Sequence, residues 1–305
     1  RINSGTSTKE IIDNLVSEEI IKSKISSFIY LKVHRNFILK AGTYELDRND
    51  STRDIFRKIN AGDIYDDSIK ITFNEGKRIT HYATLINENF GYNESDVIST
   101  INDEAYLKEL INKYWFLTDE ILNDKIYYAL EGYLFPDTYS FKKDSSIKSI
   151  IETMLDNTNK KLSNYKSDIE NSSYSIHQIL TMASIIENES MFDEDRSGVS
   201  QVIYKRLKLN MSLGMDVTTY YAVKKDLSET LTKSDLNSYN DYNTRNTSFI
   251  GLPVGPICNM GIKSIEAALK PSDTNYLYFY ADIKTGKLYF AENMTEFQKL
   301  IETYR

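Results

Sequence analysis

Apolar residues recur at helical spacing near the start of the chain, behind polar residues of the kind that begin helices. Ser7 is followed three residues later by Glu10, which is the spacing of a capping box. The apolar positions that follow repeat every three or four residues: Ile11, Ile12, Leu15, Val16 and Ile20. Ser51 precedes a similar run that should end near Gly62. The pattern predicts a helix in each place.

Strand-like segments alternate with these helices. Residues 41–46 follow two apolar runs and combine a Gly turn with a strand pattern. Residues 69–73 alternate between apolar and polar side chains, and the Asn-Glu-Gly sequence at 74–76 should turn the chain. Together these elements predict a small α/β module over residues 1–78.

The remaining residues, 79–305, show a mainly helical pattern with one expected hairpin. Residues 131–139 interrupt it, because aromatic side chains gather there around a Gly and a Pro, which indicates a fixed loop. Further helices are expected at 175–188, 199–209 and 262–269, a loop at 251–256, and hairpin strands at 276–281 and 287–291. We therefore predict an α+β protein in which the small module precedes a larger mixed α/β domain.

Composition narrows the possible functions. The formal net charge of −7 argues against a general nucleic-acid partner, because phosphate binding needs a basic surface. The single cysteine, Cys258, excludes disulfides within the chain. The three histidines show no ligand spacing and no Gly-rich phosphate loop occurs, so we expect neither a metal nor a cofactor. The chain has no run of about 18 apolar residues that would predict a membrane span.

Glu187 is the residue whose setting best fits acid–base chemistry. It lies at the end of a predicted helix that is apolar on most sides, and it stacks over Ala183 and Ser184. Burial penalises a charged carboxylate, so a Glu in this place can stay protonated near neutral pH and act as a general acid. The alternative is that Glu187 only ends the helix and faces water, and spacing alone favours that alternative.

Other candidates are weaker. Glu189 would point roughly 200° away from Glu187 on a continuing helix, so the two should not form the carboxylate pair of a common glycosidase. Residues 193–195 are all acidic and are expected to form a solvated loop. Cys258 has no evident His partner and is expected to be a small buried hydrophobe. On spacing alone the following are turn or cap residues: Asp216, Thr218, Asn243 and Thr244.

Several ordered segments resemble one family of bacterial proteins. They are Glu131-Gly132-Tyr133-Leu134-Phe135-Pro136-Asp137-Thr138-Tyr139, Met182-Ala183-Ser184-Ile185-Ile186-Glu187, residues 199–207 and 211–222, Tyr242-Asn243-Thr244 with Gly251-Leu252-Pro253, and Tyr276-Leu277-Tyr278-Phe279. On these segments the chain resembles the YceG-like endolytic murein transglycosylases, the MltG family. The resemblance covers nearly the whole chain.

The resemblance implies a reaction and a set of residues. Residues 1–78 look like the LysM-like module that precedes the catalytic domain in this family, and residues 79–305 like that domain. The family's catalytic Glu falls on Glu187, which implies non-hydrolytic cleavage of the MurNAc–GlcNAc β-1,4 bond with a 1,6-anhydro product. One carboxylate then suffices, because the nucleophile is the 6-hydroxyl of the substrate. Substrate-binding roles are implied for Asp137, Asp216, Thr218, Asn243 and Glu189.

The resemblance also implies a cellular setting. Family members carry one N-terminal transmembrane helix, which would precede Arg1 and leave the catalytic part on the extracytoplasmic side of the bacterial cell membrane. The expected substrate is peptidoglycan, in the form of nascent glycan strands whose elongation the enzyme would terminate. The expected partners are penicillin-binding proteins and the rest of the cell-wall synthesis machinery.

Some residues depart from the family's usual pattern. Val217, Thr219, Val254, Met260 and Lys205 stand where other residues are usual, but none of them replaces the implied acid. Substrate preference is therefore less firmly implied than the type of reaction. Two alternatives stay open: a non-catalytic peptidoglycan-binding protein with the same fold, and a true hydrolase that leaves reducing MurNAc ends.

Overall fold

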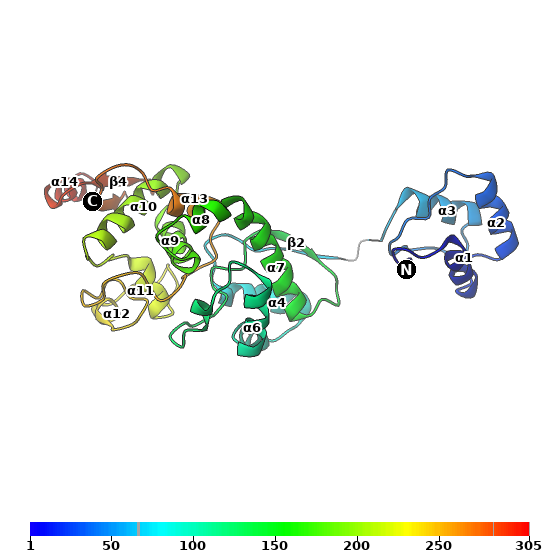
Figure 1. Cartoon of the computed structure of the whole chain (residues 1–305), viewed down its shortest axis with the longest axis horizontal. Helices are drawn as coiled ribbons and strands as arrows, with labels where there is room; N and C mark the ends of the chain where they lie inside the picture. Colours follow the sequence, from blue (N-terminus) through cyan, green and yellow to red (C-terminus); the bar gives the residue numbers. More distant parts are fainter. Residues whose placement is uncertain (66–67, 283, 305) are drawn as a thin grey trace. The chain divides into compact units, whose positions relative to one another are not determined.

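The computed structural model describes residues 1–65, 68–282 and 284–304, and the chain divides into two compact units, Arg1–Ser68 and Ile69–Arg305. The helices of the first unit are α1 (Thr8–Ser17), α2 (Lys24–Val33) and α3 (Thr52–Ala61) (Figure 1). The predicted capping box of Ser7 and Glu10 starts α1, and Ser51 caps α3. Gly62 ends α3 in a left-handed conformation. The two helices predicted here are therefore confirmed.

The core of the first unit lies between α1 and α3, and it is formed by Ile11, Ile12, Leu15, Ile21, Ile55, Phe56 and Ile59. The strand predicted at 41–46 is wrong. Within the described residues of this unit, the segment pairs only through the single bridge between Ile2 and Gly42. A strand needs a run of paired residues along its length, whereas here the backbone contacts are single ones, such as that from the Tyr65 N–H to the Thr43 carbonyl oxygen at 2.8 Å. The Tyr44 hydroxyl instead donates to the carbonyl oxygens of Lys40 (2.9 Å) and Ile59 (3.2 Å).

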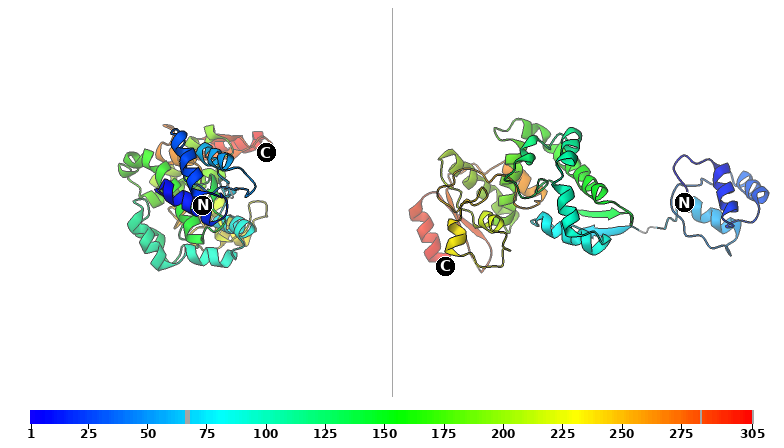
Figure 2. Two further views of the ribbon diagram at one scale, coloured as in Figure 1. Left: turned by 90° about the vertical axis from the view of Figure 1, so that its right-hand side faces the viewer. Right: turned by 90° about the horizontal axis from the view of Figure 1, so that it is seen from below.

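The second unit begins with β1 (Ile69–Thr72), which pairs with β2 (Thr138–Phe141) in an antiparallel sheet. The two strands lie side by side in the right-hand view of Figure 2, in cyan and green. Because β1 belongs to this sheet, the second unit starts at Ile69 and not at residue 79, where the sequence had suggested the boundary.

The helices of the second unit are α4 (Ile79–Phe90), α5 (Glu94–Ile101), α6 (Glu104–Lys113), α7 (Ile147–Leu162), α8 (Lys166–Glu170), α9 (Ile176–Glu189), α10 (Asp193–Lys208), α11 (Asp216–Ala222), α12 (Lys233–Asn237), α13 (Ile262–Leu269) and α14 (Met294–Tyr304), with 3-10 turns η1 (Asp119–Leu122) and η2 (Ser163–Tyr165). The predicted hairpin is formed by β3 (Tyr278–Ala281) and β4 (Leu288–Ala291), with α14 beside it (Figure 1). Ile283, in its turn, lies outside the described residues. The unit is therefore mixed α/β, as predicted. In the described part of the chain, no helix is long and apolar enough to cross a membrane.

Helix α9 forms the centre of the second unit and positions Glu187. It begins with a capping box between Ser175 and Gln178. Of the eleven positions from Ile176 to Ile186, only Gln178 is not buried. Helices α10, α11 and α13 pack against it. The end of α9 is therefore held on several sides.

The acidic residues 193–195 form the first turn of α10, so the prediction of a solvated loop is wrong. Negative side chains are favourable at the amino end of a helix, where the helix dipole is positive. Asp195 is also buried, and its Oδ2 accepts a hydrogen bond from the Leu288 backbone N–H at 3.1 Å. The acidic run thus starts α10 and links it to β4.

The loop predicted at 131–139 is irregular up to β2 and has a buried aromatic cluster that includes Tyr133 and Phe135. The Asn259 side chain holds it, because Oδ1 accepts from the N–H groups of Gly132 (3.0 Å) and Leu134 (3.2 Å). Gly132 has φ of +82°, and a Cβ there would lie 2.5 Å from Pro256 Cβ. The position therefore requires glycine for both its conformation and its lack of a side chain.

Replacing Gly132 with Ala is expected to lower the free energy of unfolding by roughly 2–4 kcal/mol, because backbone strain adds to overpacking. Gly91→Ala is the matched control, since Gly91 has φ of +74° but nothing within 4 Å of the added Cβ. In the control, the free energy of unfolding should fall by only about 1–2 kcal/mol, which is the strain of an Ala in the left-handed conformation. Urea unfolding measures both changes, and equal losses would mean that the contact with Pro256 relaxes without cost.

Candidate active site

Glu187 lies in the last turn of α9, with a side chain that is only 7% exposed. Its Oε2 accepts hydrogen bonds from Arg196 Nη1 (3.1 Å), the Gly261 backbone N–H (3.1 Å) and the Ser264 hydroxyl (2.7 Å). Within the described residues, Oε1 receives only a long contact from Arg196 Nη2 at 3.5 Å. One oxygen is therefore firmly held, and the other is available for proton transfer.

Arg196, on α10, is the cation that compensates the buried carboxylate. Its side chain is 9% exposed, and its Nε donates to Asp193 Oδ1 at 3.0 Å. Nη1 also donates to the hydroxyl of Ser264, which is fully buried. Gly261 precedes α13, so Glu187 also lies at the positive end of that helix. Burial of the carboxylate is costly by itself, and these groups offset that cost.

A second carboxylate, that of Glu75, lies beside this cluster on the turn between β1 and α4. It fills the space that a Cβ on Gly261 would need, and Gly261 is the residue whose N–H binds Glu187. Partial burial and, next, the negative charge of Glu187 raise the pKa of Glu75. The sequence indicated only a turn at 74–76, because the partner residues are far away along the chain.

Asn259 places this turn beside the rest of the site. Its carbonyl oxygen accepts from the Gly76 N–H at 2.8 Å, and its N–H donates to the Lys77 carbonyl oxygen at 2.9 Å. The amide Nδ2 donates to Glu131 Oε1 at 3.2 Å. Three segments distant in sequence, at 74–77, 131–134 and 259–261, are thus joined around one buried side chain.

Glu131 is a fully buried carboxyl that connects α4, α11 and the Asn259 side chain beneath the site. It accepts from the Ile79 N–H at the start of α4 (2.9 Å) and from the Tyr221 hydroxyl on α11 (3.1 Å). Burial raises the pKa of Glu131 to about 8, although these hydrogen bonds oppose the rise. The folded protein therefore holds a proton here more tightly than the unfolded chain does.

This proton should make stability depend on pH. The raised pKa favours the folded state fully below the ordinary pKa of 4.5, and that contribution is lost as pH rises through about 8. The free energy of unfolding should therefore fall more steeply between these pH values in the wild type than in Glu131→Gln, whose amide keeps the shape. Chemical denaturation across this range tests it, and identical slopes for the two proteins would contradict it.

Glu189 has different neighbours from Glu187, as the helical spacing predicted. Burial raises the pKa of Glu189 to about 7, and the negative charge of Asp216 contributes next. The backbone N–H of Val217 and the cations Arg245 and Arg206 oppose the rise. Glu189 therefore faces α11, whereas Glu187 faces α10 and α13.

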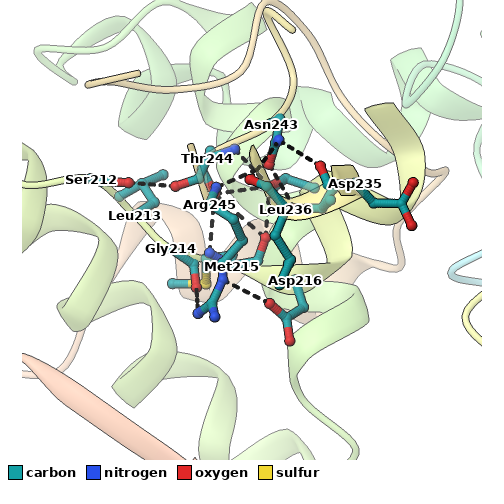
Figure 3. Close-up of polar contacts among 12 residues, drawn as sticks. Ser212, Leu213, Gly214, Met215, Asp216, Asp235, Leu236, Asn243, Thr244 and Arg245 are labelled. Atoms are coloured by element: carbon teal, nitrogen blue, oxygen red, sulfur yellow. Dashed lines mark hydrogen bonds and ion pairs between the residues drawn. The ribbon is translucent and has the colours of Figure 1, made fainter. Parts of the chain in front are cut away.

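Thr218 and Asn243 are fully buried, which does not fit direct substrate binding. The Asn243 amide donates to carbonyl oxygens at 235, 236 and 238, and its Oδ1 accepts from the Thr219 hydroxyl at 2.7 Å (Figure 3). The Thr218 hydroxyl donates to the Met215 carbonyl oxygen at 2.7 Å. Through these hydrogen bonds the two residues hold neighbouring loops together, and the substrate role expected for them from the resemblance stays a prediction.

Asp216 and Asp137 are both accessible. Asp216 is 58% exposed and pairs with Arg245 Nε at 3.1 Å, as Figure 3 shows. Asp137 is 43% exposed and pairs with Lys161 Nζ at 3.5 Å. Partial burial works against it, but hydrogen bonds from Asn157 and Thr138, together with Lys161, lower the pKa of Asp137 overall. Both residues can therefore present a charged pair to a ligand.

Two cavities border residues that adjoin Glu187. One, of about 390 Å³, borders Asn188 and Gly76 and has a mainly polar lining that includes Lys77, Arg78, Thr80, His81, Asp226 and Ser228. The other, of about 310 Å³, borders Arg196 and Asp193. A long polar chain that passed Glu187 would therefore find space next to it at more than one place.

The Cys258 thiol is buried, as predicted, and burial raises its pKa well above the usual value, so the reactive thiolate is disfavoured. Among the described residues, no group of three or more His, Cys, Asp or Glu side chains is placed to hold a metal ion.

Comparisons with known proteins agree on one family. The model of the YceG-like family matches residues 1–303. An endolytic murein transglycosylase of Bacillus subtilis (strain 168) is 37% identical over 99% of this chain and 83% of its own length. An endolytic murein transglycosylase of Streptococcus pneumoniae serotype 2 is 30% identical over 97% of this chain, which spans 56% of that relative. The crystal structure of a putative YceG-like protein from Listeria monocytogenes matches with a TM-score of 0.72 and 36% identity, over 98% of this chain and 97% of that one. The chain therefore belongs to the YceG-like family.

Proposed function

We propose that this chain is a lytic transglycosylase that cuts peptidoglycan glycan strands internally, with Glu187 as its single acid–base catalyst. The observation that carries the proposal is the asymmetry of that carboxylate: Oε2 accepts three hydrogen bonds, while Oε1 receives only one long contact from the residues that the structure describes. The activity named for the relatives from Bacillus subtilis and Streptococcus pneumoniae supports it.

The proposed reaction needs one group that gives a proton and later takes one back. Glu187 first protonates the glycosidic oxygen between MurNAc and GlcNAc, and the bond from MurNAc C1 to that oxygen breaks. The 6-hydroxyl of the same MurNAc then bonds to C1 and gives its proton to Glu187. The catalyst is restored, no water is consumed, and the product carries a 1,6-anhydro ring.

The contacts of Glu187 fit both halves of this cycle. After the first proton transfer the carboxylate is negative, and Arg196, Gly261 and Ser264 stabilise it through Oε2. A side chain that is 7% exposed is largely shielded from bulk water, so the proton can pass directly between Glu187 and the substrate. Because the hydrogen bonds are made to Oε2, proton transfer at Oε1 does not break them.

The glycan strand is proposed to run along the polar cavity beside Asn188 and past the pairs that Asp216 and Asp137 form with their cations. Glu189 lies on the α11 side of the same helix end and is proposed to line the strand there. The presence of two separate cavities next to Glu187 fits a cut within a strand better than a cut at its end. Thr218 and Asn243 are proposed to hold the loop that carries Asp216.

Product analysis tests the proposal. Purified glycan strands are digested with the protein, and the new ends are weighed by mass spectrometry. An anhydro end is one water lighter than the reducing end that hydrolysis leaves, so anhydro ends are expected. Products that contain only reducing ends would overturn the transglycosylase mechanism, and no cleavage at all would favour a non-catalytic binding protein.

The alternative function, a hydrolase that leaves reducing MurNAc ends, makes a specific prediction about Glu75. Hydrolysis uses a second carboxylate to activate water, and Glu75 is the carboxylate that lies beside Glu187. Under our proposal, Glu75→Gln lowers the rate but leaves the anhydro product unchanged. A hydrolase would lose its reducing-end product in this variant.

We further propose the cellular role that the resemblance implies. The first unit would be a LysM-like module, and the second unit would act outside the cytoplasm on nascent strands at the bacterial membrane. Cutting these strands would end their elongation, beside penicillin-binding proteins. Longer glycan strands in cells that carry only the Glu187→Gln protein would support this role, and unchanged strand lengths would contradict it.

A further inference from the structure

Helix α2 of the first unit carries apolar side chains on two opposite faces. Tyr30 and Leu31 pack against the core of the unit. Ile25, Ile29 and Val33 follow one another at intervals of four residues, so they form a stripe on the other face, and they are 74%, 58% and 72% exposed. A contiguous apolar patch that is exposed commonly marks a surface that meets another molecule or a membrane. The outer face of α2 is therefore expected to meet another surface.

More exposed apolar side chains belong to the same unit. Among the described residues, half of the large apolar side chains that are exposed lie in it, although it holds less than a quarter of the chain. They are Ile25, Phe28, Ile29, Val33, Ile38, Ile64 and Tyr65. Exposed apolar side chains are thus more frequent in this small unit than in the rest of the described chain.

The charge around α2 indicates what could cover this face. The chain as a whole has a net charge of −7, yet residues 20–44 contain no Asp or Glu. The segment has five exposed basic residues: Lys22, Lys24, Lys32, Arg35 and Lys40. Lys24 pairs with Asp13 on α1, but in the part of the chain that the structure describes Lys32 and Arg35 form no ion pair. An apolar stripe accompanied by free basic residues is typical of a helix that lies on an anionic membrane surface.

We propose that α2 docks the first unit onto the anionic headgroups of a lipid bilayer. Ile25, Ile29 and Val33 would enter the interface, and Lys32 and Arg35 would meet the lipid phosphates. A second copy of this chain is a poorer occupant, because a two-fold contact would bring two basic segments together. The inference does not depend on the catalytic site.

Vesicle binding by the whole chain tests this proposal. The protein is sedimented with vesicles of phosphatidylcholine alone and with vesicles that also contain phosphatidylglycerol. Binding to the anionic vesicles should be roughly tenfold stronger or more, and high salt should weaken it. If the wild-type protein binds neither kind of vesicle, or both equally, the proposal is wrong.

Three variants locate the binding surface. Ile29→Glu places a charge in the stripe at an exposed position, and Lys32→Ala with Arg35→Ala removes the free cations but leaves the stripe. Each should weaken binding to anionic vesicles by roughly tenfold. The matched control is Ile250→Glu, since Ile250 is 57% exposed in the second unit, and it should bind as the wild type does. Equal binding by Ile29→Glu and the wild type would overturn the proposal, as would a dimer that Ile29→Glu dissociates while vesicle binding is unchanged.

Discussion

Replacing Glu187 with Gln is expected to lower the rate of glycan-strand cleavage by roughly a hundredfold to ten-thousandfold, the range typical for loss of a general acid–base group. Gln has the same shape, and its carbonyl oxygen can accept the hydrogen bonds that Gly261 and Ser264 give to Oε2. Its amide cannot give up and regain a proton in the way the reaction requires. The variant should therefore fold and still bind strands, and the release of anhydro ends measures its activity.

A surface Glu provides the control for this variant. Glu170, on α8, is 61% exposed and contacts Lys166 at 3.7 Å, so Glu170→Gln makes the same chemical change away from the site. It should cleave strands at the wild-type rate. If Glu187→Gln also cleaves at that rate, another group supplies the proton and our assignment of the catalyst fails.

The sequence was informative about Glu187 because its setting is local. The capping box at Ser175 and the apolar positions of α9 place it at the end of a buried helix, and these signals lie within one segment. Spacing alone still favoured a solvent-facing Glu. The resemblance of the surrounding segment reversed that interpretation, and the structure buries the side chain.

The rest of the carboxylate's surroundings depends on tertiary packing. Arg196 lies just after an acidic run that was interpreted as a loop, and only the packing of α10 against α9 turns it toward Glu187. Glu75 reaches the site because Lys77 pairs with Asn259. The local pattern of apolar and polar residues cannot predict this contact, because the two segments are far apart in the sequence. For Thr218 and Asn243 the resemblance to the family identified the residues, but it could not show that both side chains are fully buried.

Replacing Arg196 with Met is expected to lower the free energy of unfolding by roughly 3–5 kcal/mol, because it leaves the buried Glu187 carboxylate without its cation. The Met side chain can fill the space of the apolar stem of Arg but carries no charge. The loss of stability therefore reports mainly the missing charge. The free energy of unfolding of Arg196→Lys should lie between those of the wild type and Arg196→Met. An ammonium keeps the charge but cannot contact Glu187, Ser264 and Asp193 together, as the planar guanidinium does.

A double-mutant cycle separates this effect from a general loss of packing. If the cost of Arg196→Met comes from an unpaired carboxylate, then adding Glu187→Gln removes that carboxylate and should restore part of the stability. The double variant is therefore expected to unfold at a higher urea concentration than Arg196→Met alone, although both of its sites are altered. Simple addition of the two single effects would mean that the ion pair is not coupled. Arg196 would then serve as a packing residue, and the stabilisation of the carboxylate would have to come from Gly261, Ser264 and the amino end of α13.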